Sequence, residues 1–515
     1  MHRCCLFFMA FLTTICSSPL LAQPSADEVP KPSVNVSEYD WLHTELNMLQ
    51  FYNREALLNF YKKWKKTDKE KLSVVHFGDS HCQHEVLPGQ LRKRLQKIHG
   101  DAGRGLMFSY SAARTYSSVE YKTSHSGTWT SERSFTMRPK LPMGVRGMTA
   151  YTNSAPASLK FQFTDHVPKE HTLLKIFCKK DVRSYDLIVE AGGERIPVSI
   201  DASNKAPYIT VRIPEIKDRT LTLHVVKNNA HETQFEYYGM SLEADVNNGL
   251  IYHNAGVGAA RWNSLLYQEL LWEQLPSLEP DVLVIDFGTN DYLYNDIIRP
   301  ELEKEIKTII NKMRQTVPDA SIILTSAQDL YWKKRNCKSG EPFSDLIHRI
   351  AAETDCAVFD WYWISGAQGT MLDWVRKGLA QPDMVHLTVA GYRLKGDLFA
   401  DAIENTITWL DKHPEANEFY FNLDKLKEEQ KTVRSKIPEY NASAYTASSK
   451  TSTATAVAPA STEGRTKYIH KIKTGESLYS IGKKYHVTVS QIKSWNGMRS
   501  DTIYAGKSLV IYVKK

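Results

Sequence analysis

The amino-acid sequence predicts an α/β domain with a parallel sheet, an antiparallel β-sandwich inserted into it, and a small βααβ domain at the C-terminus. Apolar, strand-like runs alternate with helical stretches in residues 71–105 and again in 246–412, as in a parallel sheet with crossover helices. Residues 106–245 show short alternating runs instead. A stretch rich in Ser, Thr and Ala then separates the last compact unit, residues 467–513.

The parallel sheet is predicted from apolar runs that lead into turns and helices. The first run, Leu72 to Phe77, precedes a helix expected from about Glu85 to His99. Four more apolar runs are expected to be strands, at 250–253, Val282–Phe287, Ile322–Thr325 and Ala357–Trp361. Two further helices are expected at 298–316 and 388–410. Because strands and helices alternate along both segments, we expect them to form one α/β domain.

The segment 106–245 is predicted to be an insertion. Its apolar residues recur at every second position, as in Leu159, Phe161 and Phe163, and turns rich in Gly, Pro, Asn and Asp separate the runs. Since the α/β pattern resumes after it, the sandwich is not a terminal domain. Residues 23–70 are expected to form a helical lead-in, because apolar residues recur at helical spacing from Trp41 onward.

The composition and the N-terminal residues limit which kinds of protein this chain can be. The chain has 515 residues, 42% hydrophobic and 24% charged, with a net charge of +7, as in a soluble protein of several domains. Nucleic acid is not expected as a partner, because the sequence shows no basic face interleaved with stacking aromatic residues. Residues 1–22 combine Arg3, a short apolar run and a small residue, Ala22, as in a secretory signal peptide. We therefore expect an exported protein, periplasmic or cell-envelope associated, without a transmembrane anchor.

Cysteine and histidine patterns predict no metal and no cofactor. The cysteines that follow the signal peptide are Cys82, Cys178, Cys337 and Cys356. They are too few for a disulfide scaffold, and Cys337 and Cys356 form either a bridge or two free buried thiols. His76, His81 and His84 lie close in sequence, but no carboxylate-rich ligand set of suitable spacing accompanies them.

Two polar turns offer a nucleophile and a base. Ser80 follows the first apolar run within Gly78-Asp79-Ser80 and precedes a helix, so we expect it at the carboxyl end of a parallel strand. Asp383 stands three residues before His386 and can reach its Nδ1, which leaves Nε2 to take a proton from a serine. Taken singly, the serine turn is more readily interpreted as an ordinary turn that caps a helix, and the Asp383–His386 turn is equally compatible with a surface loop.

A third polar turn offers a hydrogen-bond donor. Asn290 follows the run Val282–Phe287 within the sequence Gly288-Thr289-Asn290-Asp291. Its side-chain amide can donate to a developing oxyanion. A capping asparagine is the alternative interpretation of this residue.

Together these blocks resemble the SGNH (GDSL-like) hydrolase family, whose motifs occur in the same order. The resemblance covers residues 71–105 and 246–410. It implies a flavodoxin-like α/β/α sandwich with Ser80 as nucleophile, His386 as general base and Asp383 as the carboxylate that orients it.

The resemblance also implies an oxyanion hole. Its donors are the backbone N–H of Ser80, a glycine N–H and the Asn290 amide. The glycine block, Asn254-Ala255-Gly256-Val257-Gly258-Ala259, is one residue shorter than the usual family pattern. Gly258 is our choice for the glycine donor, with Gly256 as the alternative.

Residues 467–513 resemble a LysM domain over their whole length. The turn Thr474-Gly475-Glu476-Ser477 leads from a strand into a helix whose Leu478, Ile481 and Tyr485 face inward. LysM modules bind glycans that contain N-acetylglucosamine, chiefly peptidoglycan or chitin. Residues 413–466 are expected to be a linker.

The combined pattern predicts a secreted serine esterase that removes O-acetyl groups from cell-wall glycan through an acyl-Ser80 intermediate. A β-sandwich between the serine and glycine blocks is the layout of peptidoglycan O-acetylesterases, which points to N-acetylmuramic acid as the acetylated sugar. Three alternatives stay open: an O-acetyltransferase with the same triad, a general carbohydrate or lipid esterase, and a non-catalytic peptidoglycan-binding protein.

Overall fold

The computed structural model describes residues 29–434, 465–472, 478–496 and 506–514. They belong to two compact units, Met1–Tyr440 and Asn441–Lys515. The predicted signal peptide, residues 1–22, lies outside the described residues. Within the described residues, every helix is too short or too polar to cross a membrane.

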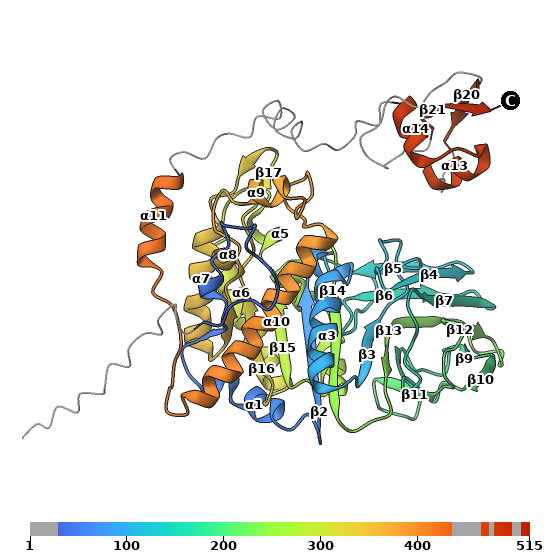
Figure 1. Ribbon diagram of the computed structural model, residues 1–515. Helices are drawn as coiled ribbons and strands as arrows, with labels where there is room; N and C mark the ends of the chain where they lie inside the picture. Colours follow the sequence, from blue (N-terminus) through green and yellow to red (C-terminus); the bar gives the residue numbers. More distant parts are fainter. Residues whose placement is uncertain (1–28, 435–464, 473–477, 497–505, 515) are drawn as a thin grey trace, which may run out of the picture. The chain divides into compact units, whose positions relative to one another are not determined.

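A six-stranded sheet forms the centre of the first unit, in the order β1-β19-β16-β15-β2-β14 (Figure 1). The strands are β1 (Gln50–Phe51), β2 (Lys71–Gly78), β14 (Gly249–Gly256), β15 (Val282–Asp286), β16 (Ser321–Thr325) and β19 (Ala357–Phe359). All neighbours pair in parallel except β1, which pairs antiparallel with β19. This is the doubly wound order of flavodoxin-like folds, in which functional residues gather at the carboxyl ends of the strands.

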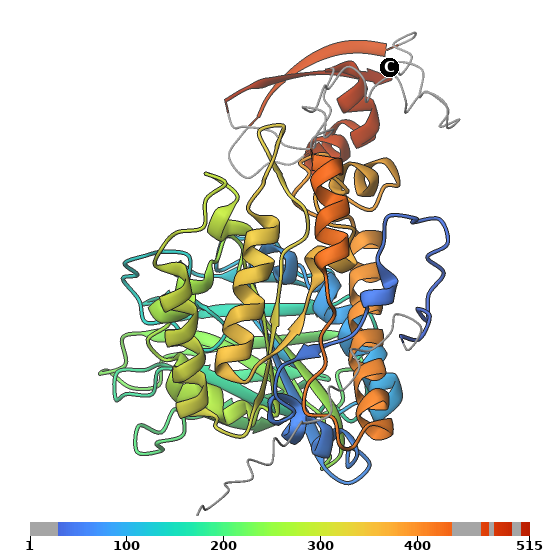
Figure 2. The same ribbon diagram turned by 90° about the vertical axis from the view of Figure 1, so that its left-hand side faces the viewer.

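Helices cover both faces of this sheet (Figures 1 and 2). One face carries α3 (Val86–His99) and α10 (Val389–Lys412), and the other carries α6 (Leu302–Thr316) and α7 (Gly340–Thr354). Each packs through an apolar stripe at helical spacing. Strand β15 is buried along its whole length, as expected for a parallel strand covered on both sides.

The inserted segment forms two antiparallel sheets, in the orders β10-β9-β12-β7-β4 and β11-β8-β13-β6-β5, with β3 also paired to β13. The strands are β3 (Gly103–Met107), β4 (Tyr121–Ser126), β5 (Thr130–Arg133), β6 (Met148–Thr152), β7 (Ala157–Phe163), β8 (Leu173–Cys178), β9 (Asp186–Ala191), β10 (Glu194–Val198), β11 (Tyr208–Arg212), β12 (Thr220–Val226) and β13 (Phe235–Glu243). One apolar cluster runs from Phe77 of the central sheet to Leu159 of the insert. The insert therefore shares its core with the α/β domain.

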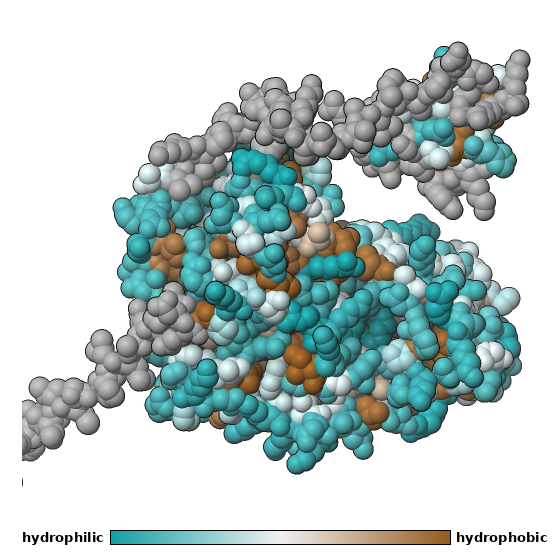
Figure 3. All heavy atoms as spheres, in the orientation of Figure 1, coloured by the Kyte–Doolittle hydropathy of each residue, from teal (hydrophilic) through white to brown (hydrophobic). Residues whose placement is uncertain are grey.

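The alternation seen in the sequence has a direct structural counterpart. In β7, Leu159, Phe161 and Phe163 are buried, whereas Lys160 and Gln162 are exposed. The outer face is correspondingly hydrophilic over most of the insert (Figure 3). The predicted fold class is confirmed, although β3 joins the insert's sheet a few residues before the expected start at 106.

The lead-in, residues 23–70, differs from the prediction of a helical segment. Helix α1 (Glu55–Trp64) is its only α-helix among the described residues. The segment with helical spacing instead contains a single 3-10 turn, Thr44–Leu46, and the edge strand β1. Phe51 of β1 pairs with Phe419 as well as with β19, so pairing at the sheet edge outweighs the local spacing.

The predicted linker also begins later than residue 413. Phe419 is buried, and its pairing with Phe51 fixes this part of the chain to the first unit. Helix α11 (Asp424–Arg434) follows, and its Lys427 donates to Asp345 of α7 at 2.7 Å. Most of the remaining linker, residues 435–464, lies outside the described residues.

The C-terminal unit has the predicted βααβ order. It contains β20 (Arg465–Lys471), α13 (Leu478–Tyr485), α14 (Val489–Trp495) and β21 (Ser508–Lys514), with β20 antiparallel to β21. Leu478 and Ile481 are buried in its apolar cluster, as expected, while Tyr485 packs against it partly buried. The turn at 474–477 lies outside the described residues.

Candidate active site

Ser80 lies at the carboxyl end of the central strand β2. It is the first residue of the short helix α2 (Ser80–Gln83), which the side chain of Asp79 caps by accepting the backbone N–H of His81. A Cβ atom at Gly78 would stand only 2.5 Å from Sγ of Cys82. Glycine therefore allows the helix to fold back onto the strand end, and Ser80 is held at that sharp turn.

His386 and Asp383 reach Ser80 from the loop before α10. The hydroxyl of Ser80 lies 2.8 Å from Nε2 of His386, and Nδ1 of His386 lies 2.7 Å from Oδ2 of Asp383. Oδ1 of Asp383 accepts the backbone N–H groups of Val385 and His386, both at 3.0 Å. Because Asp383 accepts at Nδ1, Nε2 is left to accept the Ser80 hydroxyl. The structure thus brings the three predicted residues together.

The charge of this group is set by the pair Asp383 and His386. Burial alone would lower the pKa of His386, but the hydrogen bond and negative charge of Asp383 outweigh it and raise the pKa above 6.5. Burial would raise the pKa of Asp383, and the hydrogen bond from His386 lowers it overall. Asp383 is therefore an anion near neutral pH and stabilises the imidazolium that proton transfer creates.

The two glycines predicted as oxyanion donors have their N–H groups engaged. Gly258 donates to Oε1 of Gln83 at 2.6 Å, and Gly256 donates to Oδ1 of Asn254 at 2.9 Å. The next residue, Ala259, has a φ of 66° and is exposed, and its N–H bonds to no other group in the described part of the chain. The sequence analysis considered only glycines as backbone donors in this turn, so it did not single out Ala259.

Asn290 lies beside the serine turn, in α5 (Thr289–Tyr292) after β15. Its side-chain amide donates to Oδ2 of Asp79 at 3.2 Å and to the carbonyl of Ala260 at 3.0 Å. Burial raises the pKa of Asp79 to about 7, against the opposing hydrogen bond from the backbone of His81. Asn290 therefore joins the serine turn to the turn after β14.

The insert supports the turn after β14. The guanidinium of the buried Arg146 donates to the carbonyl of Gly256 at 2.7 Å. Gln83, which holds Gly258, donates in turn to Oγ1 of Thr115 and to the carbonyl of Tyr116. These contacts tie the inserted sandwich to the predicted oxyanion region, and no local sequence motif announces them.

A second polar group lies behind the serine turn. His76, Cys82 and Asp286 are buried with their ligand-type atoms within 4.8 Å of one another, the one such group found among the described residues. The ammonium of Lys395 lies 3.1 Å from Asp286, which also accepts the hydroxyl of Thr325 at 2.6 Å. Because this ammonium already balances the carboxylate, the group does not fit a metal cation.

The four cysteines that the structure describes are all free and buried. Cys337 and Cys356 therefore form no bridge, which resolves the alternative left open by their spacing.

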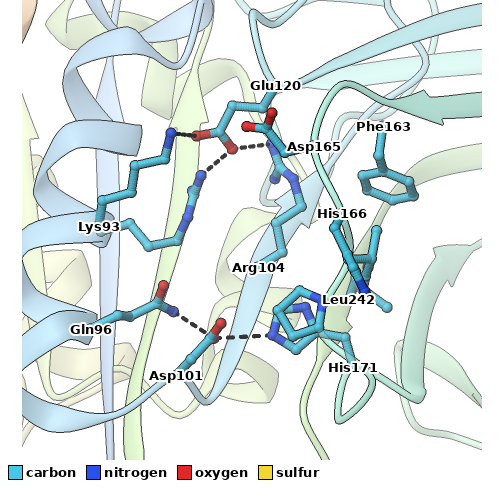
Figure 4. A pocket seen from close by; sticks show the side chains of 13 residues that line it. Lys93, Gln96, Asp101, Arg104, Glu120, Phe163, Asp165, His166, His171 and Leu242 are labelled. Atoms are coloured by element: carbon cyan, nitrogen blue, oxygen red, sulfur yellow. Dashed lines mark hydrogen bonds and ion pairs between the residues drawn. The ribbon is translucent and has the colours of Figure 1, made fainter. Parts of the chain in front are cut away.

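A pocket of about 200 Å³ lies between α3 and the insert, away from the serine turn (Figure 4). Several of its polar side chains pair with one another. Glu120 faces Arg92 and Arg104, and Asp101 accepts from Gln96. Ser80, Asp383 and His386 are not among its lining residues, so we assign it no part in the candidate site.

Two families match the chain. The GDSL-like lipase/acylhydrolase family matches residues 229–394, which include the glycine block, Asn290 and the Asp383–His386 pair. The LysM domain family matches residues 470–511. The chain thus carries a GDSL-like hydrolase domain and a LysM domain. These matches confirm the predicted resemblances. Lipases and acylhydrolases, after which the first family is named, hydrolyse esters.

Individual relatives match over short stretches. A probable N-acetylmuramidase of Lactococcus lactis subsp. lactis (strain IL1403) is 40% identical over 57 residues, 11% of this chain and 12% of that protein. The probable peptidoglycan endopeptidase LytE of Bacillus subtilis (strain 168) is 49% identical over 41 residues, 8% of this chain and 12% of that protein. The chain therefore spans only about an eighth of these relatives.

A solved structure resembles the chain over more than two thirds of its length. It is described as "Peptidoglycan O-acetylesterase in action, 5 min" and matches with a TM-score of 0.59 and 20% identity. The match covers 70% of this chain and 99% of that one. At this identity the likeness establishes a shared fold.

Proposed function

We propose that this protein is a serine esterase that removes O-acetyl groups from cell-wall glycan, with peptidoglycan N-acetylmuramic acid as the acetylated sugar. One observation carries the proposal, the unbroken chain of hydrogen bonds from Asp383 through His386 to Ser80 at the carboxyl edge of the sheet. The similarity in fold to a structure described as a peptidoglycan O-acetylesterase supports the choice of ester.

The geometry suits a two-step acyl transfer. Nε2 of His386 takes the proton of Ser80 as its oxygen attacks the acetyl carbonyl, and Asp383 stabilises the imidazolium. His386 then gives this proton to the departing sugar oxygen, which leaves an acetyl-Ser80 ester. Water activated by the same imidazole attacks this ester, releasing acetate and restoring Ser80.

The oxyanion of each tetrahedral intermediate needs donors that are not already engaged. We assign the backbone N–H groups of Ser80 and Ala259 to this role, since neither bonds to another described group. Asn290 is the third donor, and it would shift one amide hydrogen from Asp79 or Ala260 to the oxyanion. Gly258 instead acts through its bond to Gln83 to fix the shape of the turn.

The LysM domain is proposed to hold the enzyme on peptidoglycan. The relatives that match short stretches are named as a probable N-acetylmuramidase and a probable peptidoglycan endopeptidase, which supports the same polymer as partner. An exported, cell-envelope location follows from this substrate and agrees with the signal peptide predicted over residues 1–22.

The direct test is acetate release from O-acetylated peptidoglycan, compared with the same material after chemical de-acetylation. We expect acetate only from the first, and none from either with the Ser80→Ala variant. Failure of the wild-type protein to release acetate from acetylated peptidoglycan would refute the proposed substrate. Transfer of acetyl to added muroglycan, with little free acetate, would identify an O-acetyltransferase instead.

A further inference from the structure

His81 is a buried imidazole next to His386 that the proposed mechanism leaves without a role. It follows Ser80 in α2 and is 4% exposed. Its ring centroid lies 5.2 Å from that of His386, with 33° between the ring planes. The two rings are therefore neighbours with tilted planes, at a separation usual for aromatic contacts.

Hydrogen bonds fix the orientation of the His81 ring. The hydroxyl of Tyr392 in α10 lies 2.8 Å from its Nδ1, and Oγ1 of Thr289 in α5 lies 3.2 Å from its Nε2. The amide of Gln328 also approaches Nε2, at 3.5 Å, and donates to the carbonyl of Val385 at 3.0 Å. Partners on both nitrogens prevent the ring from rotating.

The surroundings keep this imidazole neutral. Burial lowers the pKa of His81 well below 6.5, and the nearby charges of His386 and Lys395 lower it further. Asp286 and Asp383 act in the opposite direction without reversing the shift. Tyr392 is the other titratable group that faces His81, and burial raises its pKa well above 10. His386 therefore faces an uncharged aromatic ring through the whole range in which it titrates.

We propose that His81 is a positioning residue, whose neutral ring, held by Tyr392 and Thr289, keeps His386 directed at Ser80 and favours its imidazolium form. An aromatic face attracts a cation placed against it, and the imidazolium exists only after proton transfer from the nucleophile. A fixed ring also limits the rotation of His386 away from Ser80. The inference rests on the proposed function, because His386 must be the general base.

Two substitutions at His81 distinguish the effect of the aromatic ring from the effect of its hydrogen bonds. Both His81→Phe and His81→Leu lose the bonds to Tyr392 and Thr289, but only His81→Phe keeps an aromatic face. The assay is hydrolysis of p-nitrophenyl acetate by the full-length protein as a function of pH, with thermal unfolding as the check on folding. We expect kcat of the Leu variant to be about tenfold below that of the Phe variant, at similar KM.

The pH profile gives a second, independent readout. Without an aromatic face the imidazolium of His386 is less stable, so the acidic limb of kcat in the Leu variant should lie at lower pH than in the Phe variant. Equal kcat values and coincident acidic limbs for the two variants would overturn the inference. Ser80→Ala serves as the reference: if it stays active, the proposed function itself fails, whereas its inactivity together with equal Phe and Leu variants refutes only the role of His81.

Discussion

Two groups that take their nucleophilic atoms from α2 combine them with an imidazole and a carboxylate, and these nucleophiles are two residues apart. The serine group is Ser80 with His386 and Asp383, and the cysteine group is Cys82 with His76 and Asp286. By residue type the cysteine group is as good a candidate for nucleophilic catalysis as the serine group. Geometry and exposure separate them.

In the serine group the imidazole uses different nitrogens for its two partners, which allows a proton to move from Ser80 to a ring that Asp383 supports. In the cysteine group a single nitrogen, Nε2 of His76, faces both the thiol at 3.5 Å and the carboxylate of Asp286 at 3.6 Å. The side chain of His386 is 39% exposed, whereas that of His76 is fully buried.

The protonation states of the two groups also favour the serine group as the catalytic one. Burial raises the pKa of the Cys82 thiol, so the reactive thiolate is disfavoured. Burial would also raise the pKa of Asp286, but the charge of Lys395 together with the contacts of His76 and Thr325 outweighs it and lowers this pKa overall, so the carboxylate serves an ion pair. The comparison shows that residue types alone do not define a catalytic group. The nucleophile and the carboxylate must contact different ring nitrogens, and substrate must reach the nucleophile.

The largest expected effect is the loss of activity in Ser80→Ala. Removing the nucleophile should lower kcat for p-nitrophenyl acetate on the order of 10⁴-fold or more, with little change in unfolding, because a small hydroxyl contributes little packing. The matched control is Cys82→Ala, which should cost about 1–3 kcal/mol of stability and keep most of the activity. Loss of activity in a folded Cys82→Ala protein, with Ser80→Ala active, would reverse the assignment of the two groups.

The next effect concerns the carboxylate of the serine group. Asp383→Asn should lower kcat roughly 10⁴-fold, since an amide no longer selects the tautomer with a free Nε2. Asp383 raises the pKa of His386, so any remaining activity should persist to lower pH than in the wild type. A pH–rate profile measures both effects, and an acidic limb that moves to higher pH would contradict the assignment.

In the cysteine group, the expected effect is on stability. Lys395→Met leaves the buried carboxylate of Asp286 without its cation and should lower the free energy of unfolding by about 3–5 kcal/mol near neutral pH. Because the pKa of Asp286 is depressed, the stability it contributes is present above about pH 4 and is lost as the pH falls below that value. Urea unfolding at pH 7 and at pH 3 should therefore show a smaller difference between variant and wild type at the lower pH.

The smallest effect on the chemistry is expected from removing residues 441–515. Both polar groups lie in the other compact unit, so turnover of p-nitrophenyl acetate should change less than about twofold. Acetate release from insoluble peptidoglycan should fall, because the LysM domain no longer raises the local enzyme concentration. Equal binding of truncated and full-length protein to sacculi would show that the anchor lies elsewhere, with the insert as the next candidate.

The parts of the site that the sequence predicted are those set by local spacing. Asp383 and His386 are three residues apart, and Ser80 directly follows an apolar strand, so both features can be recognised from short windows. The contacts that support the proposed oxyanion region could not be recognised in this way. Gln83 meets Gly258 across 175 residues, and Arg146 meets Gly256 across 110.

The same distinction explains where the predicted fold differs from the structure. The parallel sheet and the sandwich follow from periods that repeat over many residues. The edge strand β1 is only two residues long and is defined by its partners, β19 and Phe419. The N–H of Ala259, which bonds to no other described group, likewise depends on a backbone conformation that its neighbours impose, and alanine gives no local sign of it.

The central claim, that Ser80 and not Cys82 is the nucleophile, can be tested by trapping the acyl-enzyme. The full-length protein is mixed with p-nitrophenyl acetate, quenched in acid and digested, and the peptide that contains both residues is fragmented in a mass spectrometer. We predict one acetyl group on Ser80, absent in Ser80→Ala and still present in Cys82→Ala. An acetyl group on Cys82, or a Ser80→Ala protein that still forms an acyl-enzyme, would contradict the claim.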